Sequence, residues 1–379
     1  MREHFRPAWV EVDLDAVAAN VSILARLVAP AQVCAVVKAD AYGHGAPAVA
    51  RAALAGGASG LAVALVEEGV ALREAGISAP ILLLSEPTPE GIAEAVRRDL
   101  VLTCYRPEAV ATAAAAARAG GVRATVEVKV DTGMHRVGAE PEAAIACARA
   151  VAAEPSLALG GLWTHFAVAD DPADPFTARQ LELLLSCRAR LAAAGVAPRR
   201  VHAANSAGAI AHPAARLDLV RCGISCYGYS PVPALGPPGL VPALSLRARV
   251  HLVRSLEEGE ATSYGRLYRL ERRSEIAVVP LGYHDGVPRA LFPAGGEVLI
   301  RGRRRPIAGA VTMDQLIVDC GPDGDVQPGD EAVLIGRQGD AVIDAGDWGR
   351  WLSTIPYEVL CGIGPRVPRR TVGGAGTAR

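Results

Sequence analysis

The amino-acid sequence predicts an α/β fold in which an N-terminal (β/α)₈ barrel of the TIM type is followed by a mostly β domain. Eight short apolar runs alternate with helical segments over about 200 residues, a pattern typical of a parallel sheet closed by crossover helices. From about residue 236 the pattern changes to short apolar runs separated by turns rich in proline and glycine, which indicates strands. An open, doubly wound sheet remains an alternative for the first domain.

The candidate elements follow one another in a regular order. The alanine-rich segments 107–120 and 176–195 have the composition and apolar spacing of helices that end at glycine. Before the first strand, residues 11–27 are expected to form a helix capped by Asp13, so its acidic residues are interpreted as capping groups, and no metal site is expected. The eight candidate strands are rich in Val, Ile and Leu and cover residues 33–37, 60–65, 81–84, 100–104, 124–130, 159–165, 200–204 and 217–220.

These elements define the expected domain boundaries. Residues 1–235 should form the barrel with an N-terminal extension. Residues 236–370 should form the β domain, and residues 371–379, which are rich in glycine, should be a disordered tail.

Composition excludes several classes of protein. The net charge of −1 gives no basic surface for nucleic acid or anionic lipid. No run of about 18 apolar residues is free of charges and turns, so no membrane span is expected. The N-terminal sequence lacks the apolar core of a secretory signal, and the eight cysteines show neither a zinc spacing nor a disulfide framework. A cytoplasmic protein with reduced thiols is expected.

The scarcity of lysine is the most informative feature of the composition. Lysine and arginine together number 39, yet lysine occurs only at positions 38 and 129. Arginine stays protonated, whereas a lysine amine can lose its proton in an apolar setting and attack a carbonyl group or carbon dioxide. We therefore expect both lysines to occupy positions where arginine is chemically unsuitable.

Polar and reactive residues follow the ends of the candidate strands. In a (β/α)₈ barrel the C-terminal ends of the strands form the active site, and phosphate is commonly held after strands seven and eight. A desolvated Lys38 amine suits Schiff-base formation with the aldehyde of pyridoxal 5′-phosphate, whose phosphate needs hydroxyl and backbone N–H donors. The residues expected at this rim are Lys38, Tyr42, Arg136, His165, Asn205, Ser206, Arg221, Gly223 and Ile224.

Seven motifs in a fixed order resemble those of the alanine racemase family. The most specific is AVVKADAYGHG, which contains Lys38 and resembles the family's cofactor-lysine segment. It is supported by VDTGMHRVG, HAANS, VRCGI, TSYG, GYHDG and MDQ, and the resemblance extends from AWVEVDLDA near the start to PYEVLCGIGPRVPR near the end. This resemblance implies a pyridoxal-phosphate isomerase of barrel-plus-β architecture that makes D-alanine, a peptidoglycan precursor.

The resemblance also implies a role for individual residues. Lys38 would bind the cofactor covalently and act as one of two bases. Tyr264 would be the second base, supplied across the interface of a homodimer. Arg221 would face the pyridine nitrogen, with His165 orienting it. The phosphate would be held by Tyr42, Ser206, Gly223, Ile224 and Tyr357.

Four further positions concern the substrate, L- or D-alanine. The resemblance implies that Met313 offers its backbone N–H to the substrate carboxylate and that Tyr283 lines the entrance. Arg136 would be the cationic partner of that carboxylate. Lys129 would be carbamylated and would position Arg136; an internal salt bridge is the simpler alternative. One position departs from the family pattern, since Ala310 stands where an arginine of the substrate corridor is common.

Three rival functions remain. A serine or broad-specificity racemase of the same fold is the nearest, although Tyr357 and the absence of an export signal argue against it. A decarboxylase of the same architecture should carry a cysteine-containing motif that is not found. A non-enzymatic pyridoxal-phosphate-binding protein typically keeps only the barrel, whereas this chain carries TSYG and MDQ in a second domain.

Overall fold

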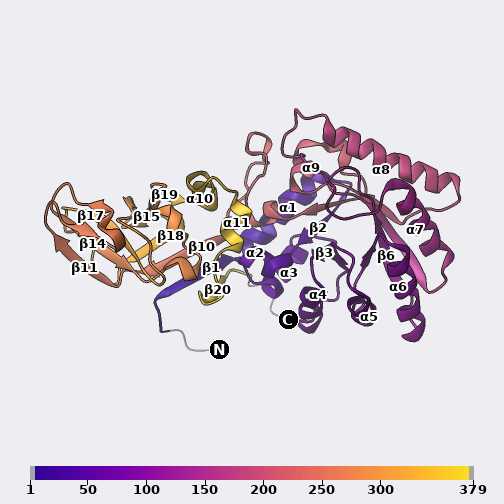
Figure 1. Cartoon of the computed structure of the whole chain (residues 1–379), viewed down its shortest axis with the longest axis horizontal. Coiled ribbons are helices and arrows are strands. Elements are labelled where there is room, and N and C mark those ends of the chain that lie inside the picture. The colour runs from indigo at the N-terminus through magenta and orange to yellow at the C-terminus, as the bar shows by residue number, and fades with distance from the viewer. Residues whose placement is uncertain (1–4, 375–379) are drawn as a thin grey trace. The chain divides into compact units, whose positions relative to one another are not determined.

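The computed structural model describes residues 5–374, which fold into two compact units. The barrel unit contains residues 15–41 and 45–241, with Gly374. The β unit contains residues 5–14, 42–44 and 242–373. Figure 1 shows the helices around the barrel strands in one unit and the strand-rich architecture of the other.

Eight parallel strands form the sheet of the barrel unit, in the order β4-β3-β2-β9-β8-β7-β6-β5. The outermost two strands, β4 (Ile81–Leu83) and β5 (Leu102–Cys104), are joined through Val101. Leu83 N–H donates to the Val101 carbonyl at 3.0 Å, and Val101 N–H donates to the Ile81 carbonyl at 2.8 Å. The predicted barrel is therefore confirmed, and the open-sheet alternative does not hold. The other strands are β2 (Gln32–Val36), β3 (Gly60–Val63), β6 (Ala124–Lys129), β7 (Leu157–Trp163), β8 (Arg200–His202) and β9 (Leu219–Cys222).

Helices alternate with these strands and bury one face against them. Several begin with proline at their first turn, where the missing N–H has no intrahelical partner to lose. The predicted helices at 107–120 and 176–195 correspond to α6 (Pro107–Ala119) and α8 (Phe176–Ala193). The remaining helices of this unit are α1 (Leu14–Val28), α3 (Ala46–Ala55), α4 (Val66–Glu74), α5 (Pro89–Arg97), α7 (Pro141–Ala153) and α9 (Ser206–Ala211).

The β unit contains sheets of seven, three and two strands. The largest has the order β16-β15-β18-β10-β1-β20, with β19 added to β18. Helices α10 (Ala345–Leu352) and α11 (Pro356–Cys361) complete the unit. The strands are β1 (Ala8–Asp13), β10 (Leu244–Arg249), β11 (Leu252–Leu256), β12 (Ala261–Thr262), β13 (Tyr268–Arg269), β14 (Ser274–Val279), β15 (Glu297–Ile300), β16 (Arg303–Pro306), β17 (Leu316–Gly321), β18 (Glu331–Gln338), β19 (Ala341–Ile343) and β20 (Arg369–Val372).

The two chain ends meet in this sheet. Strand β1 pairs antiparallel with β10 and parallel with β20, so the N-terminal extension is a strand of the β unit rather than part of the barrel. After the buried apolar residues Ala8 and Trp9, residues 10–13 alternate apolar and polar side chains, the pattern of a half-buried strand, and α1 begins only after Asp13. At the other end, Thr371 and Val372 belong to β20, and residues 375–379 of the expected tail lie outside the described residues.

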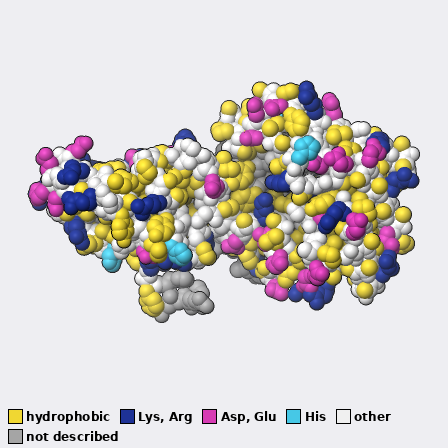
Figure 2. All heavy atoms as spheres, in the orientation of Figure 1, with side chains coloured by type: hydrophobic (Ala, Val, Ile, Leu, Met, Phe, Trp, Pro, Cys, Tyr) yellow, Lys and Arg dark blue, Asp and Glu magenta, His cyan; other side chains and the backbone are white. Residues whose placement is uncertain are grey.

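Three surface and composition features bear on function. On the face drawn in Figure 2, acidic and basic side chains are interspersed. No helix among residues 5–374 is long and apolar enough to cross a membrane. Across the same residues no group of three or more His, Cys, Asp and Glu side chains is arranged to hold a metal ion, and all eight cysteines are free thiols.

Candidate active site

The barrel brings most of the expected residues to one rim. Lys38 follows β2, Lys129 is the last residue of β6, His165 follows β7 and Arg221 lies in β9. These groups are close enough for their charges to interact: Arg221, Arg136 and Lys38 all lower the pKa of Lys129. The cluster is therefore strongly cationic, which suits a cofactor that carries phosphate and a substrate that carries a carboxylate.

Arg221 is the most deeply buried charge of this cluster, with 2% of its surface exposed. Burial lowers its pKa to about 10, so the guanidinium stays charged at neutral pH. Its Nη2 donates to the carbonyls of Thr164 at 2.7 Å and Ala203 at 2.9 Å, and lies 3.3 Å from Nδ1 of His165. Its Nε has no hydrogen-bond partner among the described residues. A buried donor without a partner costs free energy, which indicates that a ligand atom completes the site.

His165 lies beside Arg221, and a second histidine, which the sequence did not single out, lies there as well. Burial lowers the pKa of His165 well below its usual value, so a neutral imidazole faces the guanidinium. A second histidine, His202, lies closer, with Nδ1 at 2.5 Å from Nη1 of Arg221. His202 stands in the quoted motif HAANS, and only its burial inside the barrel distinguishes it from a surface histidine.

Lys129 has the properties expected of a reactive amine. It is 4% exposed, and burial lowers its pKa to about 7, assisted by the cations around it. Its Nζ donates to the Leu84 carbonyl at 3.3 Å and lies 4.3 Å from the centre of the Trp163 ring. The neutral form is thus accessible at physiological pH, and the alternative of an internal ion pair is not observed among the described residues.

Three of the residues expected to hold the phosphate lie in two elements that follow β8 and β9. Ser206 is buried at the start of α9, and its Oγ accepts a hydrogen bond from the Gly223 N–H at 3.0 Å. Ile224 begins a short 3₁₀ helix (Ile224–Tyr227) directly after Gly223. In the β unit, Tyr42 and Tyr357 lie together, with ring centroids 5.9 Å apart. The structure thus places the five expected phosphate residues in two clusters, one in each unit.

The segment after Lys38 has an unusual backbone. Residues 38–43 form a helical turn, α2 (Lys38–Gly43), in which four residues in succession have φ between 51° and 55°. This is the left-handed conformation, which costs an L-residue other than glycine roughly 1–2 kcal/mol. The affected residues are Ala39, Asp40, Ala41 and Tyr42. Such strain is characteristic of functional sites, and it fixes the direction in which the chain leaves Lys38.

We expect Ala39→Gly to stabilise the fold. Ala39 is exposed, so the lost methyl group contributes little burial, and glycine adopts positive φ without strain. The net gain should be about 0.5–1 kcal/mol in the free energy of unfolding, measured by chemical denaturation of the cofactor-free chain. Ala115→Gly, on the exposed face of α6, is the matched control and should destabilise by about 1 kcal/mol. A loss of stability in Ala39→Gly would contradict the assignment of strain.

A buried glutamine ties two rim loops together. The Gln180 amide of α8 donates to Thr132 Oγ1 at 3.2 Å and to the His165 carbonyl at 3.1 Å, and its oxygen accepts from Ala167 N–H at 2.9 Å. Thr132 precedes Arg136 in the loop after β6, and its hydroxyl also contacts that of Thr164 at 2.7 Å. The loops that carry Arg136 and His165 are thus held to one helix, although Arg136 itself is exposed.

The remaining expected residues are exposed and lie in the β unit, where Tyr264 and Tyr283 begin short 3₁₀ helices and Met313 lies in a loop. Tyr264 is 68% exposed, Met313 52% and Tyr283 43%. The loops of Tyr283 and Met313 are joined by backbone hydrogen bonds, among them Tyr283 N–H to the Thr312 carbonyl at 2.9 Å. A separate contact joins Ser263, the neighbour of Tyr264, to the carbonyl of Ala310 at 2.5 Å. Ala310, the position that differs from the family pattern, therefore lies against the segment that carries Tyr264, the expected second base.

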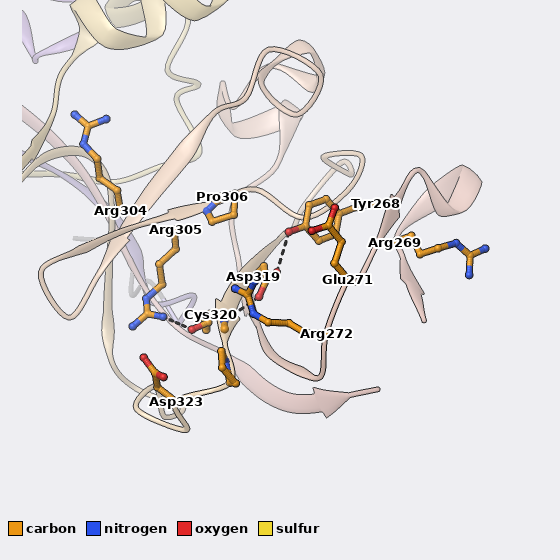
Figure 3. A pocket seen from close by; sticks show the side chains of 12 residues that line it. Tyr268, Arg269, Glu271, Arg272, Arg304, Arg305, Pro306, Asp319, Cys320 and Asp323 are labelled. Carbon is orange, nitrogen blue, oxygen red and sulfur yellow. Dashed lines mark hydrogen bonds between the residues drawn. The ribbon is translucent and has the colours of Figure 1, made fainter. Parts of the chain in front are cut away.

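A polar pocket of about 470 Å³ in the β unit is a different feature (Figure 3). Its polar groups bond to one another: the Tyr268 hydroxyl donates to Asp319 at 2.8 Å, and Arg305 donates to the Cys320 carbonyl. None of the residues expected from the sequence lines it. We therefore place the candidate active site at the barrel rim and not in this pocket.

Comparison with known proteins identifies the family to which the two units are similar. Residues 12–231 match the family model of the alanine racemase N-terminal domain, and residues 243–371 match that of the C-terminal domain. The chain is 48% identical to an alanine racemase of Symbiobacterium thermophilum over 366 residues, which is 96% of this chain and 97% of the relative.

Solved structures give the same result. The crystal structure of alanine racemase from D-cycloserine-producing Streptomyces lavendulae matches with a TM-score of 0.93 and 40% identity, and the match covers 99% of each chain. A histidine racemase from Leuconostoc mesenteroides also matches, with a TM-score of 0.87 and 30% identity, covering 98% of this chain and 99% of that one. The fold is thus shared by racemases named for different substrates.

Proposed function

The chain belongs to the alanine racemase family, and from that premise we propose that it is an isomerase that interconverts L-alanine and D-alanine with pyridoxal 5′-phosphate. The observation that carries the proposal is the unpartnered Nε of Arg221 at the centre of a cationic rim. The pyridine nitrogen of pyridoxal phosphate is a hydrogen-bond acceptor that suits the Nε–H donor of Arg221. Lys38 would bind the cofactor through its amine, and Ser206, Gly223, Ile224, Tyr42 and Tyr357 would hold the phosphate.

The cofactor supplies an electron sink that makes the Cα–H bond of the substrate acidic. Arg221 limits this sink, because a guanidinium does not readily give a proton to the ring nitrogen. His165 orients the guanidinium from one side. The arrangement favours return of a proton to Cα over transamination, which is the outcome a racemase requires.

The proton transfers use two groups on opposite faces. The Lys38 amine takes or returns the Cα proton of the D-isomer, and the phenol of Tyr264, supplied by the partner subunit of a homodimer, serves the L-isomer. Two fixed bases are simpler than one that must swing across the substrate. The Met313 N–H and Arg136 hold the substrate carboxylate, and Tyr283 lines the entrance.

The choice of substrate needs a direct test, because a histidine racemase shares the fold. The purified protein, loaded with pyridoxal phosphate, should convert L-alanine to D-alanine, followed by chiral chromatography. L-Serine, L-lysine and L-histidine are the comparison substrates. A higher specificity constant for serine would favour the serine or broad-specificity racemase, and binding of the cofactor without turnover of any of the four would favour a binding protein.

We expect Lys129 to be carbamylated, which converts a buried cation into an anion beside Arg136. Carbamylation needs the neutral amine, so the modification should be lost as pH falls below about 7, the pKa of Lys129. Lys129→Ala should lower kcat/KM, and acetate or formate should restore part of it by filling the vacated anion site. Mass spectrometry under native conditions and the acid titration of activity check the prediction. Full activity of Lys129→Ala, with no response to these acids, would contradict it.

A further inference from the structure

Three charged or polar side chains form a buried chain through the interior of the barrel. Glu127 of β6, His202 of β8 and Arg221 of β9 are 4%, 0% and 2% exposed. Glu127 Oε2 lies 2.9 Å from His202 Nε2, and His202 Nδ1 lies 2.5 Å from Arg221 Nη1. Glu127 lies two residues before Lys129 in β6, and the proposed binding of cofactor and substrate does not use it.

The direction of the hydrogen bonds fixes the protonation of the chain. A guanidinium has only donors, so Nδ1 of His202 must accept. The imidazole proton then lies on Nε2 and is donated to Glu127, which must be an ionised acceptor. Burial raises the pKa of Glu127, but His202, Arg200 and Arg221 lower it by more, and burial holds the pKa of His202 below its usual value. An ionised carboxylate and a neutral imidazole therefore lie behind Arg221.

Contacts with an aromatic ring also hold the side chains of His202 and Arg221 in this arrangement. The Trp163 ring stacks on His202 with the planes 10° apart, and Cζ of Arg221 lies 4.5 Å from the centre of the Trp163 ring. Strand β7 makes room for the carboxylate, because a Cβ at Gly161 would lie 2.9 Å from Cδ of Glu127 and 3.0 Å from its Oε1. Packing thus positions His202 and Arg221 and leaves space for the carboxylate of Glu127.

We propose that Glu127 is a positioning residue, which acts through His202 to fix the guanidinium of Arg221 with its Nε left free for the cofactor ring. The hydrogen bonds of Arg221 to His202, Thr164 and Ala203 use Nη1 and Nη2 and leave Nε as the donor that can reach a ligand. The Glu127 carboxylate fixes the imidazole tautomer and balances the buried cation. The cofactor part of this inference rests on the proposed function, whereas the hydrogen-bond chain belongs to the protein alone.

The first test uses the cofactor-free chain and therefore does not depend on the proposed function. With ¹⁵N-labelled histidine, long-range ¹H–¹⁵N spectra should show His202 as the Nε2–H tautomer, with a strongly downfield, slowly exchanging proton. His202→Asn identifies the signal by removing it. Glu127→Gln replaces the charged acceptor by a neutral amide of the same size, so the proton should move upfield and exchange at least about tenfold faster. An unchanged signal in Glu127→Gln would overturn the proposal.

The second test uses the enzyme loaded with pyridoxal phosphate. Glu127→Gln should lower kcat by about 10- to 100-fold, a range typical for loss of a hydrogen-bonding partner behind a functional group, and leave KM for alanine within about twofold. Glu127→Asp keeps the charge and should recover part of the lost kcat, which also separates positioning from a folding defect. Thr103→Val removes a buried barrel hydroxyl that has no hydrogen-bond partner among the described residues, and should leave both readouts unchanged.

The two tests separate the two hypotheses. A histidine signal that responds to Glu127→Gln in a chain that racemises no amino acid would support the hydrogen-bond chain and refute the proposed function. An active parent enzyme whose kcat is unchanged by Glu127→Gln would refute the positioning role and leave the proposed function standing.

Discussion

Lys38→Ala is expected to abolish racemisation, with a loss of more than about 10⁴-fold in kcat, because one substitution removes both the covalent attachment of the cofactor and one of the two bases. The position after β2 and the strained turn that follows it place this amine at the rim. Steady-state rates in both directions, measured with added pyridoxal phosphate, check the loss.

Lys38→Arg is the matched control. It keeps the positive charge, but a guanidinium stays protonated and is a poor nucleophile, so this variant should be equally inactive. A small amine such as methylamine should restore part of the activity of Lys38→Ala by entering the vacated space. Appreciable activity in either variant without added amine would remove Lys38 from the mechanism.

Tyr264→Phe is expected to have the second largest effect, a loss of about 10²–10⁴-fold on the L side, the usual range for a general base. Net racemisation must fall equally in both directions, because the equilibrium constant between enantiomers is one. Exchange of the α-hydrogen of alanine with solvent distinguishes the base on one face of the substrate from the base on the other. In heavy water, Tyr264→Phe should still exchange the α-hydrogen of D-alanine through Lys38 and should lose exchange from L-alanine.

Subunit mixing tests the source of the phenol. Tyr264 is largely exposed in the single chain, which fits a residue supplied to a partner. Mixing inactive Tyr264→Phe and Lys38→Ala subunits should regenerate about one competent site per heterodimer. Equal exchange of both enantiomers by Tyr264→Phe would contradict the two-base assignment, and no recovery in verified heterodimers would contradict the shared site.

The barrel could be predicted from the sequence because its signal is local. Buried strands and amphipathic helices leave their own periodicity in each segment, and strand ends in a parallel barrel share one rim by topology. The same logic placed Lys38, Lys129, His165 and Arg221 together. The N-terminal strand could not be predicted because the short alternation of residues 10–13 runs directly into the helix pattern of α1.

The features that could not be predicted depend on tertiary contacts. The left-handed turn carries alanine and tyrosine where the conformation would favour glycine, so its strain left no mark in the local sequence. Glu127 alternates with valines in β6 and resembles a solvent-facing strand residue, and only barrel closure places it against His202. The pairing of two residues 75 positions apart has no local signature.

The most direct test of the central claim, that this chain is a pyridoxal-phosphate racemase with its cofactor at Lys38, is chemical. The protein loaded with pyridoxal phosphate is reduced with borohydride, digested and mapped by mass spectrometry. The pyridoxyl group is expected on Lys38, with loss of alanine racemisation in proportion to its incorporation. A pyridoxyl group on Lys129, or full racemase activity after complete reduction, would contradict it.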